Sequence, residues 1–401
     1  MKILQVNTLF APRRFGGAEV FLERLSKDLV ARGHQILVAC LSPTPARHGD
    51  EALQVHEFGL RNIYWPFDGA RRKPWLKAVW HLRNAFGRGG ASDVDALLRQ
   101  ERPDVVHTHN LAGFTSAVWQ VIRAHGIPLV HTIHDYALLC PSATMFRDNA
   151  NCSTPCVGCR FLSWSNQEHS QCVDAVVGVS GFALEQHLRN GYFPRAARHV
   201  IHNGNPSTER SSARSPSAES SVLRVGYLGR LAPSKGIEVM LDALLPLVPG
   251  QCQVLVAGTG AKEFEANLRS RYEPRGVRFE GRVDSARFLA DIDVLVTPSL
   301  WNEPFGLVLC EAMSAGVPVV ASAVGGVPEV FEHGRCGFLF NPGDGDALRG
   351  FVRQFAEDRE LHRRMSGNCL EKAATYAFER TVDSYLRVYD QAQAGVRRDV
   401  A

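Results

Sequence analysis

The sequence lacks several features that would place it in other classes of protein. No apolar run reaches the roughly 18 residues that a membrane-spanning helix needs. Residues 1–7 form a short strand pattern without the apolar stretch or cleavage site of a signal peptide. No dense Lys/Arg run is interleaved with aromatic residues, so the net charge of +4 does not indicate nucleic-acid binding. We therefore expect a cytoplasmic protein that binds no nucleic acid and could touch the membrane's inner face.

Sequence repeats and a complete dinucleotide-binding motif are also missing. No short-period repeat is present, which argues against a solenoid. An NAD oxidoreductase would need G-x-G-x-x-G, but residues 258–263 read Gly-Thr-Gly-Ala-Lys-Glu and lack the third glycine. No acidic residue is convincingly placed for a ribose either. These observations count against an NAD-dependent enzyme.

The chain does contain two series of alternating strand and helix patterns. Its 401 residues are too many for one ordinary core, and the polar segment 206–221 has the composition of a linker. We expect an α/β fold with domains at 1–205 and 222–377, and a last helix within 378–401 that could pack back on the first domain. The predicted strands are 3–6, 36–40, 105–106, 129–133, 175–179, 222–228, 254–257, 277–279, 294–297 and 317–321.

A glycine-bounded turn follows the predicted strand 222–228. Residues 229–236 read Gly-Arg-Leu-Ala-Pro-Ser-Lys-Gly. In open parallel sheets ligands bind at the carboxyl ends of strands, so Arg230 and Lys235 could grip a diphosphate beside a helix N-terminus. The alternative is a solvated turn with two surface cations.

A second polar motif follows the strand 294–297. Glu303 lies in a loop and Glu311 about two helical turns further on, where both carboxylates could accept hydrogen bonds from sugar hydroxyls. Backbone N–H groups at the helix start, near Gly306, Leu307 and Val308, would point at a phosphate. The alternative is that the two residues are acidic only because a helix dipole favours negative charge near the helix N-terminus. This alternative explains Glu303 better than Glu311.

These motifs in the second half resemble glycosyltransferase family 4. The family signature is a Glu, seven residues and a second Glu, which Glu303 and Glu311 match. Residues 229–236 match its phosphate-gripping motif, and Gly258-Thr259-Gly260 matches its small glycine turn. The other similar segments are 313–321, 325–329, 337–339 and 342–343.

The first half carries matching motifs as well. Residues 16–19, Gly-Gly-Ala-Glu, are similar to the family's N-terminal glycine loop. Residues 131–136, His-Thr-Ile-His-Asp-Tyr, are similar to its histidine-bearing strand end. The resemblance runs in order from residue 3 to about residue 343, which is most of the chain.

The resemblance implies the GT-B fold, with two Rossmann-like domains facing across a cleft that binds a nucleotide diphosphate sugar. It implies that Arg230 and Lys235 stabilise the leaving diphosphate without a metal or other catalytic cofactor. It places Glu303 at the donor sugar, Glu311 at the ribose, and His134 near the sugar and acceptor. Retention of anomeric configuration also comes from the family. The implied donor-binding residues are Gly16, Gly17, Gly229, Gly258, Gly306, Leu307, Val308 and Glu311.

A cysteine cluster lies within a Cys-rich loop at 140–172. Cys140, Cys152, Cys156 and Cys159 have the number of thiolates that a tetrahedral zinc site needs. The loop is rich in Pro, Ser, Asn and Gly and lacks an apolar core, so a metal or other cross-link would stabilise it. We favour a structural zinc over free buried thiols, an iron–sulfur cluster or a redox pair.

Two weaker signals remain. Residues 61–86 mix aromatic and basic side chains, and Trp75, Val79, Leu82 and Phe86 fit one helix face. We favour a helix that packs this face on the sheet, with its basic side free to meet a membrane. Residues 107–110 read His-Thr-His-Asn, and His107 and His109 flank a predicted strand end. We favour the interpretation that these two histidines line a polar loop over the alternative that they bind a metal. His134 by itself could instead be a buried, hydrogen-bonded histidine.

The sequence thus predicts a retaining hexosyltransferase that uses a UDP- or GDP-sugar and a glycan or lipid-linked acceptor. Cell-surface polysaccharide or glycolipid assembly is the expected setting. The alternatives are a nucleotide-sugar epimerase of the same architecture and an inactive nucleotide-sugar-binding protein. The base, sugar, acceptor and oligomeric state stay open.

Overall fold

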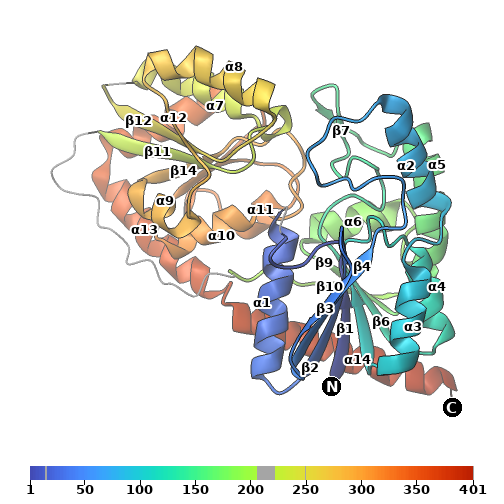
Figure 1. Ribbon diagram of the computed structural model, residues 1–401. Helices are drawn as coiled ribbons and strands as arrows, with labels where there is room; N and C mark the ends of the chain where they lie inside the picture. The colour runs from blue at the N-terminus through green and yellow to red at the C-terminus, as the bar shows by residue number, and fades with distance from the viewer. Residues whose placement is uncertain (14–15, 206–221, 249, 401) are drawn as a thin grey trace. The chain divides into compact units, whose positions relative to one another are not determined.

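The computed structural model describes residues 1–13, 16–205, 222–248 and 250–400, and divides the chain into two compact units (Figure 1). The first unit runs from Met1 to Met145 and from Cys152 to His202, and includes the chain from Glu379 onward. The second unit comprises Phe146–Asn151 and Asn203–Phe378. The predicted linker 206–221 lies outside the described residues.

The first unit is built on an eight-stranded sheet in the order β10-β9-β6-β5-β1-β2-β4-β3. All neighbouring strands are parallel except β3 with β4. The central strand β1 pairs on both sides, so Ile3 lies opposite both Ile36 and Val105. The strands are β1 (Lys2–Val6), β2 (Gln35–Ser42), β3 (Ala46–Gly49), β4 (Leu53–Gly59), β5 (Val105–Thr108), β6 (Leu129–Ile133), β9 (Ala175–Gly178) and β10 (Ala197–Val200).

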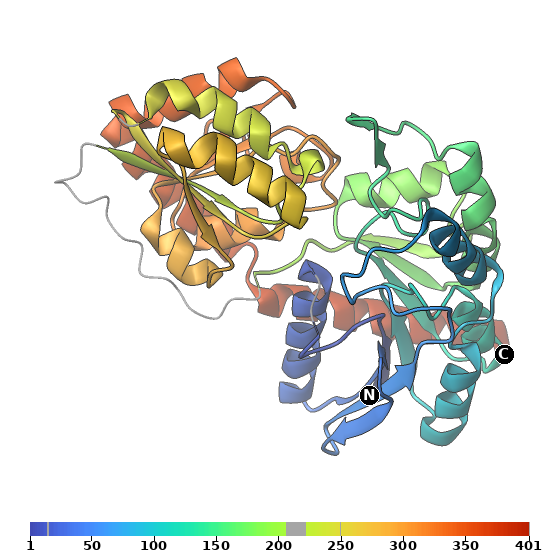
Figure 2. The same ribbon diagram turned by 45° about the horizontal axis from the view of Figure 1, so that its top comes forward.

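Helices cover both faces of this sheet, as Figures 1 and 2 show. Strands covered on both faces read as continuous apolar runs, and β2 and β6 are accordingly almost wholly buried. The helices are α1 (Gly17–Ala31), α2 (Pro74–Phe86), α3 (Ala91–Glu101), α4 (Ala117–Ala124), α5 (Val157–His169), η1 (Ser170–Cys172), α6 (Gly181–Arg189) and α14 (Phe378–Val400).

The second unit is built on a six-stranded parallel sheet in the order β13-β12-β11-β14-β15-β16. Its strands are β11 (Leu223–Leu228), β12 (Cys252–Ala257), β13 (Arg278–Gly281), β14 (Val294–Thr297), β15 (Val319–Ser322) and β16 (Gly337–Phe340). Its helices are η2 (Pro233–Lys235), α7 (Ile237–Leu244), η3 (Leu245–Leu247), α8 (Lys262–Tyr272), η4 (Glu273–Arg275), α9 (Ser285–Asp291), α10 (Leu307–Ser314), α11 (Val327–Val330), α12 (Gly345–Glu357) and α13 (Arg359–Ala374). One buried core joins β11, β12 and β14 to helices α7 and α12.

Both sheets have the strand order of a Rossmann fold. In each, the first strand is central, the next strands extend to one side, and the chain then crosses to the other side. The order reverses between β1 and β5 in the first unit and between β11 and β14 in the second. Ligands of open parallel sheets bind at the carboxyl ends of strands at such a reversal point. The predicted α/β fold with two Rossmann-like domains is confirmed.

The helix α14 brings the end of the chain back to the first unit. Tyr385 and Tyr389 on this helix are fully buried, and Arg32 of the same unit forms an ion pair with Asp383. Thr381 Oγ1 also donates to the carbonyl of His202, at 3.3 Å. The first unit therefore includes a helix that begins about 180 residues after β10, the last strand of its sheet.

The structure contains strands that the apolar runs did not reveal. These are the edge strands β3 and β10, the strands β4 and β16, and a hairpin of β7 (Phe146–Arg147) and β8 (Ala150–Asn151). The hairpin lies inside the Cys-rich loop that the sequence assigned to the first domain, yet it belongs to the second unit. There, Asn151 Nδ2 donates to the carbonyl of Leu300, and the N–H of Asn302 donates to Asn151 Oδ1, both at 2.8 Å.

The prediction that α2 packs its Trp75, Val79, Leu82 and Phe86 face on the sheet is wrong. These four side chains are 61%, 38%, 42% and 46% exposed. The buried residues of α2 are instead Trp80 and Ala85, on other faces of the helix. Helical spacing identifies an apolar stripe, but it does not say whether that stripe meets the core or the solvent.

Candidate active site

Two loops meet at the carboxyl edge of the second sheet because β11 and β14 are neighbours there. Residues 229–236 follow β11, and residues 298–306 follow β14. The backbone N–H groups of Leu300 and Trp301 both donate to the carbonyl of Ser234, at 2.9 and 3.1 Å. These bonds hold the two loops together and bring their charged side chains into one place.

An ion pair between Lys235 and Glu303 lies at the centre of this site. Lys235 Nζ is 2.6 Å from Glu303 Oε1, and the Ser299 hydroxyl donates to the same oxygen at 2.6 Å. The Lys235 ammonium also lies 4.9 Å from the centroid of the Trp301 ring. Burial raises the pKa of Glu303, but the Lys235 charge and these hydrogen bonds outweigh it, so the pKa is below its usual range. Glu303 is a carboxylate at neutral pH, and the three N–H donors of Lys235 can also serve a second anion.

Close backbone approaches fix both loops. Gly258 has φ +132°, and a Cβ there would lie 1.8 Å from the carbonyl oxygen of Gly229. Gly325 has φ +56°, and a Cβ there would lie 2.2 Å from the carbonyl oxygen of Glu303. The N–H of Gly326 donates to that same oxygen at 2.8 Å. Only glycine fits at positions 258 and 325, and the backbone of Glu303 is held from both sides.

The helix α10 begins directly after the Glu303 loop. Gly306 precedes it with φ +101°, and the N–H groups of its first turn lack intrahelical acceptors, as at any helix start. Glu311, on the same helix, is partly exposed. Burial and then the negative charge of Asp284 raise the pKa of Glu311. This arrangement offers donors for a phosphate and a carboxyl group for hydroxyls.

In the first unit, two histidines pair at the carboxyl edge of the sheet. His134 follows β6, and its Nε2 lies 2.9 Å from Nδ1 of His109, which follows β5. The ring of Phe21 packs 5.5 Å from that of His134. Burial lowers the pKa of His134 to about 4 and raises that of Asp135 to about 6. At neutral pH His134 is therefore uncharged. It forms a hydrogen bond with His109, in which the tautomers decide which ring nitrogen donates.

A buried polar network lies behind this histidine pair. The ring of His107 is 3.9 Å from that of His109. His107 Nδ1 is 2.7 Å from the Tyr389 hydroxyl, and its Nε2 is 2.8 Å from the Thr132 hydroxyl. The Thr132 hydroxyl is in turn 3.0 Å from that of Tyr385. Two tyrosines of α14 therefore take part in the hydrogen-bond network that holds His107 in place.

The glycine loop of the first unit begins α1. The N–H of Gly16 donates to the carboxylate of Glu19 at 2.7 Å, as in a capping box. Among the described residues, a Cβ at Gly16 would meet only this carboxylate, at 3.8 Å. The described residues therefore leave room for a side chain at position 16.

Two family models match the chain in order. Residues 16–204 match the model described as "Glycosyl transferase 4-like domain", and residues 223–358 match "Glycosyl transferases group 1". The chain belongs to the group 1, family 4-like glycosyltransferases. The resemblance seen in the motifs is confirmed.

Curated relatives match over most of their length. A protein of 42.6 kDa from the cps region of Klebsiella pneumoniae is 29% identical over 332 residues, which are 82% of this chain and 87% of that protein. The D-inositol 3-phosphate glycosyltransferase of a Nocardioides species is 29% identical, over 96% of this chain and 87% of that enzyme.

Solved structures share the whole GT-B fold with this glycosyltransferase. Sucrose-phosphate synthase from Thermosynechococcus elongatus has a TM-score of 0.77 at 22% identity and covers 98% of this chain and 99% of its own. Anabaena HepE in complex with UDP-glucose has a TM-score of 0.68 at 22% identity, over 98% of this chain and 100% of its own. At these identities the likeness establishes the fold.

The residues predicted from the sequence divide between the two units. In the second unit Lys235 and Glu303 are in direct contact, and Arg230 lies exposed on the same turn as Lys235. Gly229 and Gly258 touch through their backbones, Gly306 precedes α10, and Leu307 and Val308 begin it, with Glu311 further along. In the first unit Gly16 precedes α1 and Gly17 begins it, and His134 directly follows β6. The chemical roles of all these residues stay predictions.

Several partners in the site were missed by the sequence analysis. Ser299 is one, although it lies only two residues after the end of β14, the strand that led to Glu303. The prediction of a polar loop lining at 107–110 is wrong for the histidines, because His107 lies in β5 and both His107 and His109 are buried. Tyr385 and Tyr389 were also missed. Nothing in their local sequence marks them, since they meet β5 and β6 only through folding.

The predicted zinc ligands are partly gathered. Cys140 and Cys159 have their sulfurs 3.5 Å apart, and Cys156 also interacts with Cys159. However, no group of three or more His, Cys, Asp or Glu side chains among the described residues has the arrangement of a metal site. The structural zinc stays a prediction. Metal analysis of the purified protein tests it: about one zinc per chain that is lost in Cys159→Ser would support it, and metal-free protein would refute it.

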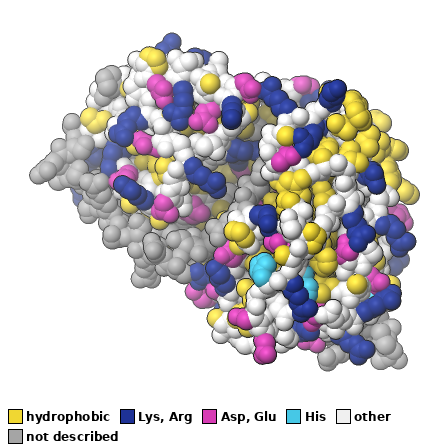
Figure 3. Space-filling model, viewed as in Figure 1, with side chains coloured by type: hydrophobic (Ala, Val, Ile, Leu, Met, Phe, Trp, Pro, Cys, Tyr) yellow, Lys and Arg dark blue, Asp and Glu magenta, His cyan; other side chains and the backbone are white. Residues whose placement is uncertain are grey.

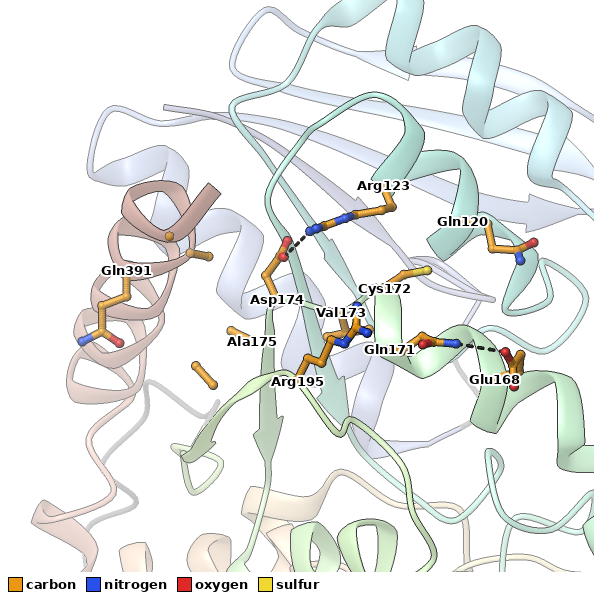
Figure 4. A pocket seen from close by; sticks show the side chains of 13 residues that line it. Gln120, Arg123, Glu168, Gln171, Cys172, Val173, Asp174, Ala175, Arg195 and Gln391 are labelled. Atoms are coloured by element: carbon orange, nitrogen blue, oxygen red, sulfur yellow. Dashed lines mark hydrogen bonds and ion pairs between the residues drawn. The ribbon is translucent and has the colours of Figure 1, made fainter. Parts of the chain in front are cut away.

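A separate pocket of about 610 Å³ opens at the opposite, amino-terminal edge of the first sheet (Figure 4). It includes Val173, Asp174 and Ala175, which lead into β9, and Gln391 of α14 (Figure 4). Its Arg123 is paired with Asp174 at 2.9 Å. Because ligands of such sheets bind at the carboxyl edge, we do not assign this pocket to the transfer reaction.

Proposed function

We propose that this glycosyltransferase transfers a hexose, with retention, from a UDP- or GDP-sugar to a glycan or lipid-linked acceptor. The Lys235–Glu303 pair at the β11–β14 reversal point is the observation that carries the proposal. A cation and a carboxylate held together there suit a ligand that has an anionic part and a hydroxylated part.

In the proposed reaction, Lys235 and Arg230 bind the diphosphate of the donor. The acceptor oxygen forms a bond to the anomeric carbon while the bond from that carbon to the β-phosphate oxygen breaks. The electron pair leaves with the phosphate, which also takes the proton of the acceptor hydroxyl. The two cations stabilise the charge that develops on the leaving group, so no metal is needed for this step.

The carboxylates orient the donor in this proposal. Glu303 is ionised and accepts hydrogen bonds from the sugar hydroxyls, while Glu311 accepts them from the ribose. The N-terminus of α10 faces a phosphate. In the first unit, His134 is uncharged at neutral pH and serves the sugar or acceptor as a hydrogen-bonding group.

Known proteins support the donor class. Anabaena HepE was solved in complex with UDP, with UDP-glucose, and with UDP and glucose. UDP-glucose is therefore the first donor to test. The relative from the Klebsiella cps region supports a role in making a cell-surface polysaccharide.

A thermal-shift panel of nucleotide sugars tests the proposal. The true donor, at roughly 100 times its Kd, should raise Tm by about 5 °C or more, because it binds only the folded state. Slow release of nucleotide, or transfer to an acceptor, then separates a transferase from an inactive binding protein. Conversion of the donor into an epimeric sugar nucleotide would instead identify an epimerase. Absence of any stabilising nucleotide sugar would refute the proposal.

Retention and metal independence are tested on the product. Proton NMR of the first-formed glycoside should show the same anomeric configuration as the donor. Addition of EDTA should leave the rate unchanged, because Arg230 and Lys235 occupy the role that a divalent cation would otherwise take. An inverted product, or a rate abolished by EDTA and restored by Mg²⁺, would contradict these two points.

A further inference from the structure

Two neighbouring helices of the first unit expose an unusual amount of apolar surface. Of the nine large hydrophobic side chains that are exposed in the described part of the chain, seven lie on α2 and α5. Figure 3 shows hydrophobic side chains gathered over these two helices. We call this the α2–α5 surface, and it consists of Trp75, Val79, Leu82, Phe86, Val157, Phe161 and Trp164.

The exposed side chains form one stripe on each helix. On α2 they recur at steps of four, three and four residues, and on α5 at steps of four and three, which keeps each set on one face. The Phe86 and Phe161 rings are 5.2 Å apart, so the two stripes are continuous. Trp75 and Trp164 remain 61% and 59% exposed. A contiguous exposed patch of this kind marks an interaction site rather than scattered surface apolar residues.

The opposite faces of the helices are held by the protein. The indole N–H of Trp80 donates to the carbonyl of Tyr64 at 3.1 Å, and Asn62 donates to the carbonyl of Trp80 at 3.1 Å. The Ser165 hydroxyl donates to the carbonyl of Ala85 and so ties α5 to α2. The apolar stripes are therefore displayed on a supported platform.

The charges on and beside the two helices are mostly positive, and the exposed Asp68 ahead of α2 is paired with Arg72. The helix α2 contains no acidic residue, and the one acidic residue of α5 is Glu168, in its last turn. Exposed cations on or beside the two helices are Arg71, Lys73, Lys77, Arg83, Arg88 and Arg160. Such a surface attracts a partner that is both apolar and anionic.

We propose that the α2–α5 surface binds an anionic lipid bilayer. Tryptophan favours the boundary between lipid and water, and helices with apolar and basic faces lie in the plane of that boundary. Symmetric pairing with a second copy would instead bring the same cations together. None of the helices described here combines the length and apolar composition of a membrane-spanning segment. The proposed attachment is therefore peripheral, and it does not depend on which donor the enzyme uses.

Vesicle binding by the full-length protein tests this proposal. Co-sedimentation should be strong with phosphatidylcholine vesicles that contain about 30% phosphatidylglycerol, and weak with phosphatidylcholine alone. Trp75→Ser/Trp164→Ser should weaken binding at least tenfold, and Lys77→Gln/Arg160→Gln should weaken it about fivefold per removed cation. Leu370→Ser is the matched control, because Leu370 is 41% exposed on α13 in the second unit, and it should bind like the unaltered protein.

Other results would overturn the proposal. These are equal binding to neutral and anionic vesicles, binding that the tryptophan substitutions do not change, and a dimer in solution that the same substitutions dissolve. Release of nucleotide from the donor in the absence of lipid is measured on each variant as well. The surface variants should keep that activity, so failure of the lipid proposal can be told apart from failure of the proposed function.

Discussion

Lys235 and Glu303 lie 68 positions apart in the chain, yet their side chains form one ion pair at 2.6 Å. The sequence predicted a separate role for each. Their pairing depends on β11 and β14 being neighbours in the sheet, which brings the loops after both strands together. A change at either residue should therefore affect the other.

Replacement of Lys235 by alanine should reduce kcat/KM for sugar transfer about 100-fold or more, because it removes a charge that stabilises the leaving diphosphate. It also leaves the Glu303 carboxylate without its cation. Lys262→Ala is the control, since Lys262 is exposed at the start of α8 and should be silent. Steady-state kinetics and a Tm measurement decide the matter, and near-normal transfer by Lys235→Ala would refute the assignment.

The buried histidine His187 should make the protein less stable in acid. Burial lowers its pKa to about 4, while in the unfolded chain it is near the ordinary 6.5. Between pH 6.5 and about pH 4, His187 is protonated in the unfolded state but not in the folded state. The free energy of unfolding therefore decreases as the pH falls through this range. The full contribution is about 3 kcal/mol.

Urea unfolding between pH 7.5 and about pH 4 measures this effect against His187→Gln. The stability of the variant should fall less steeply in that window. Parallel curves for the two proteins would contradict the prediction. Asp135 acts with the opposite sign, because its pKa is raised to about 6 and its burial costs stability as pH rises through that value. The Asp135 contribution is common to both proteins and cancels in the comparison.

At the scale of elements, replacing a glycine by alanine should change the free energy of unfolding in opposite directions, depending on whether the position has space for a Cβ. Gly258→Ala forces a Cβ against the Gly229 carbonyl and should destabilise the fold by about 2 kcal/mol or more. Gly367 lies inside α13, and a Cβ there would meet no atom of the described residues within 4 Å beyond its own helix backbone, so Gly367→Ala should stabilise the fold by about 0.5–1 kcal/mol. Denaturant unfolding of both variants checks this, and equal effects would mean that the loop after β12 is not packed against the loop after β11 as described.

The helix α2 shows the limit of reading elements from a sequence. Its period predicted a helix and an apolar face, and both are present. The face points to solvent, because Trp80 and Ala85 take the buried positions. Periodicity records which residues share a face, whereas the partner of that face is a property of the surrounding fold. The strand β4 was missed because Gln54, His56 and Glu57 interrupt its apolar run, and β16 because its apolar run is only Phe338 to Phe340.

At the scale of the whole molecule, the first unit should depend on the end of the chain. Tyr385 and Tyr389 of α14 are fully buried and reach Thr132 and His107 by hydrogen bonds. A fragment of residues 1–205 leaves these partners unpaired and exposes their core, so it should be unstable or unfolded. A fusion of 1–205 to 378–401 through a flexible linker should recover cooperative unfolding. Equal stability of the fragment and the fusion would contradict this prediction.

By itself the sequence determined the fold class, the order of most strands and helices, and the positions of Arg230, Lys235, Glu303, Glu311 and His134 after strand ends. This information is local, because apolar runs, glycine turns and helix starts are encoded in neighbouring residues. Only the tertiary structure decided which of these side chains touch, which face of α2 meets water and which buried residues α14 contacts. Those contacts join residues far apart in the chain, and their energy arises only when the sheets are assembled and water is excluded.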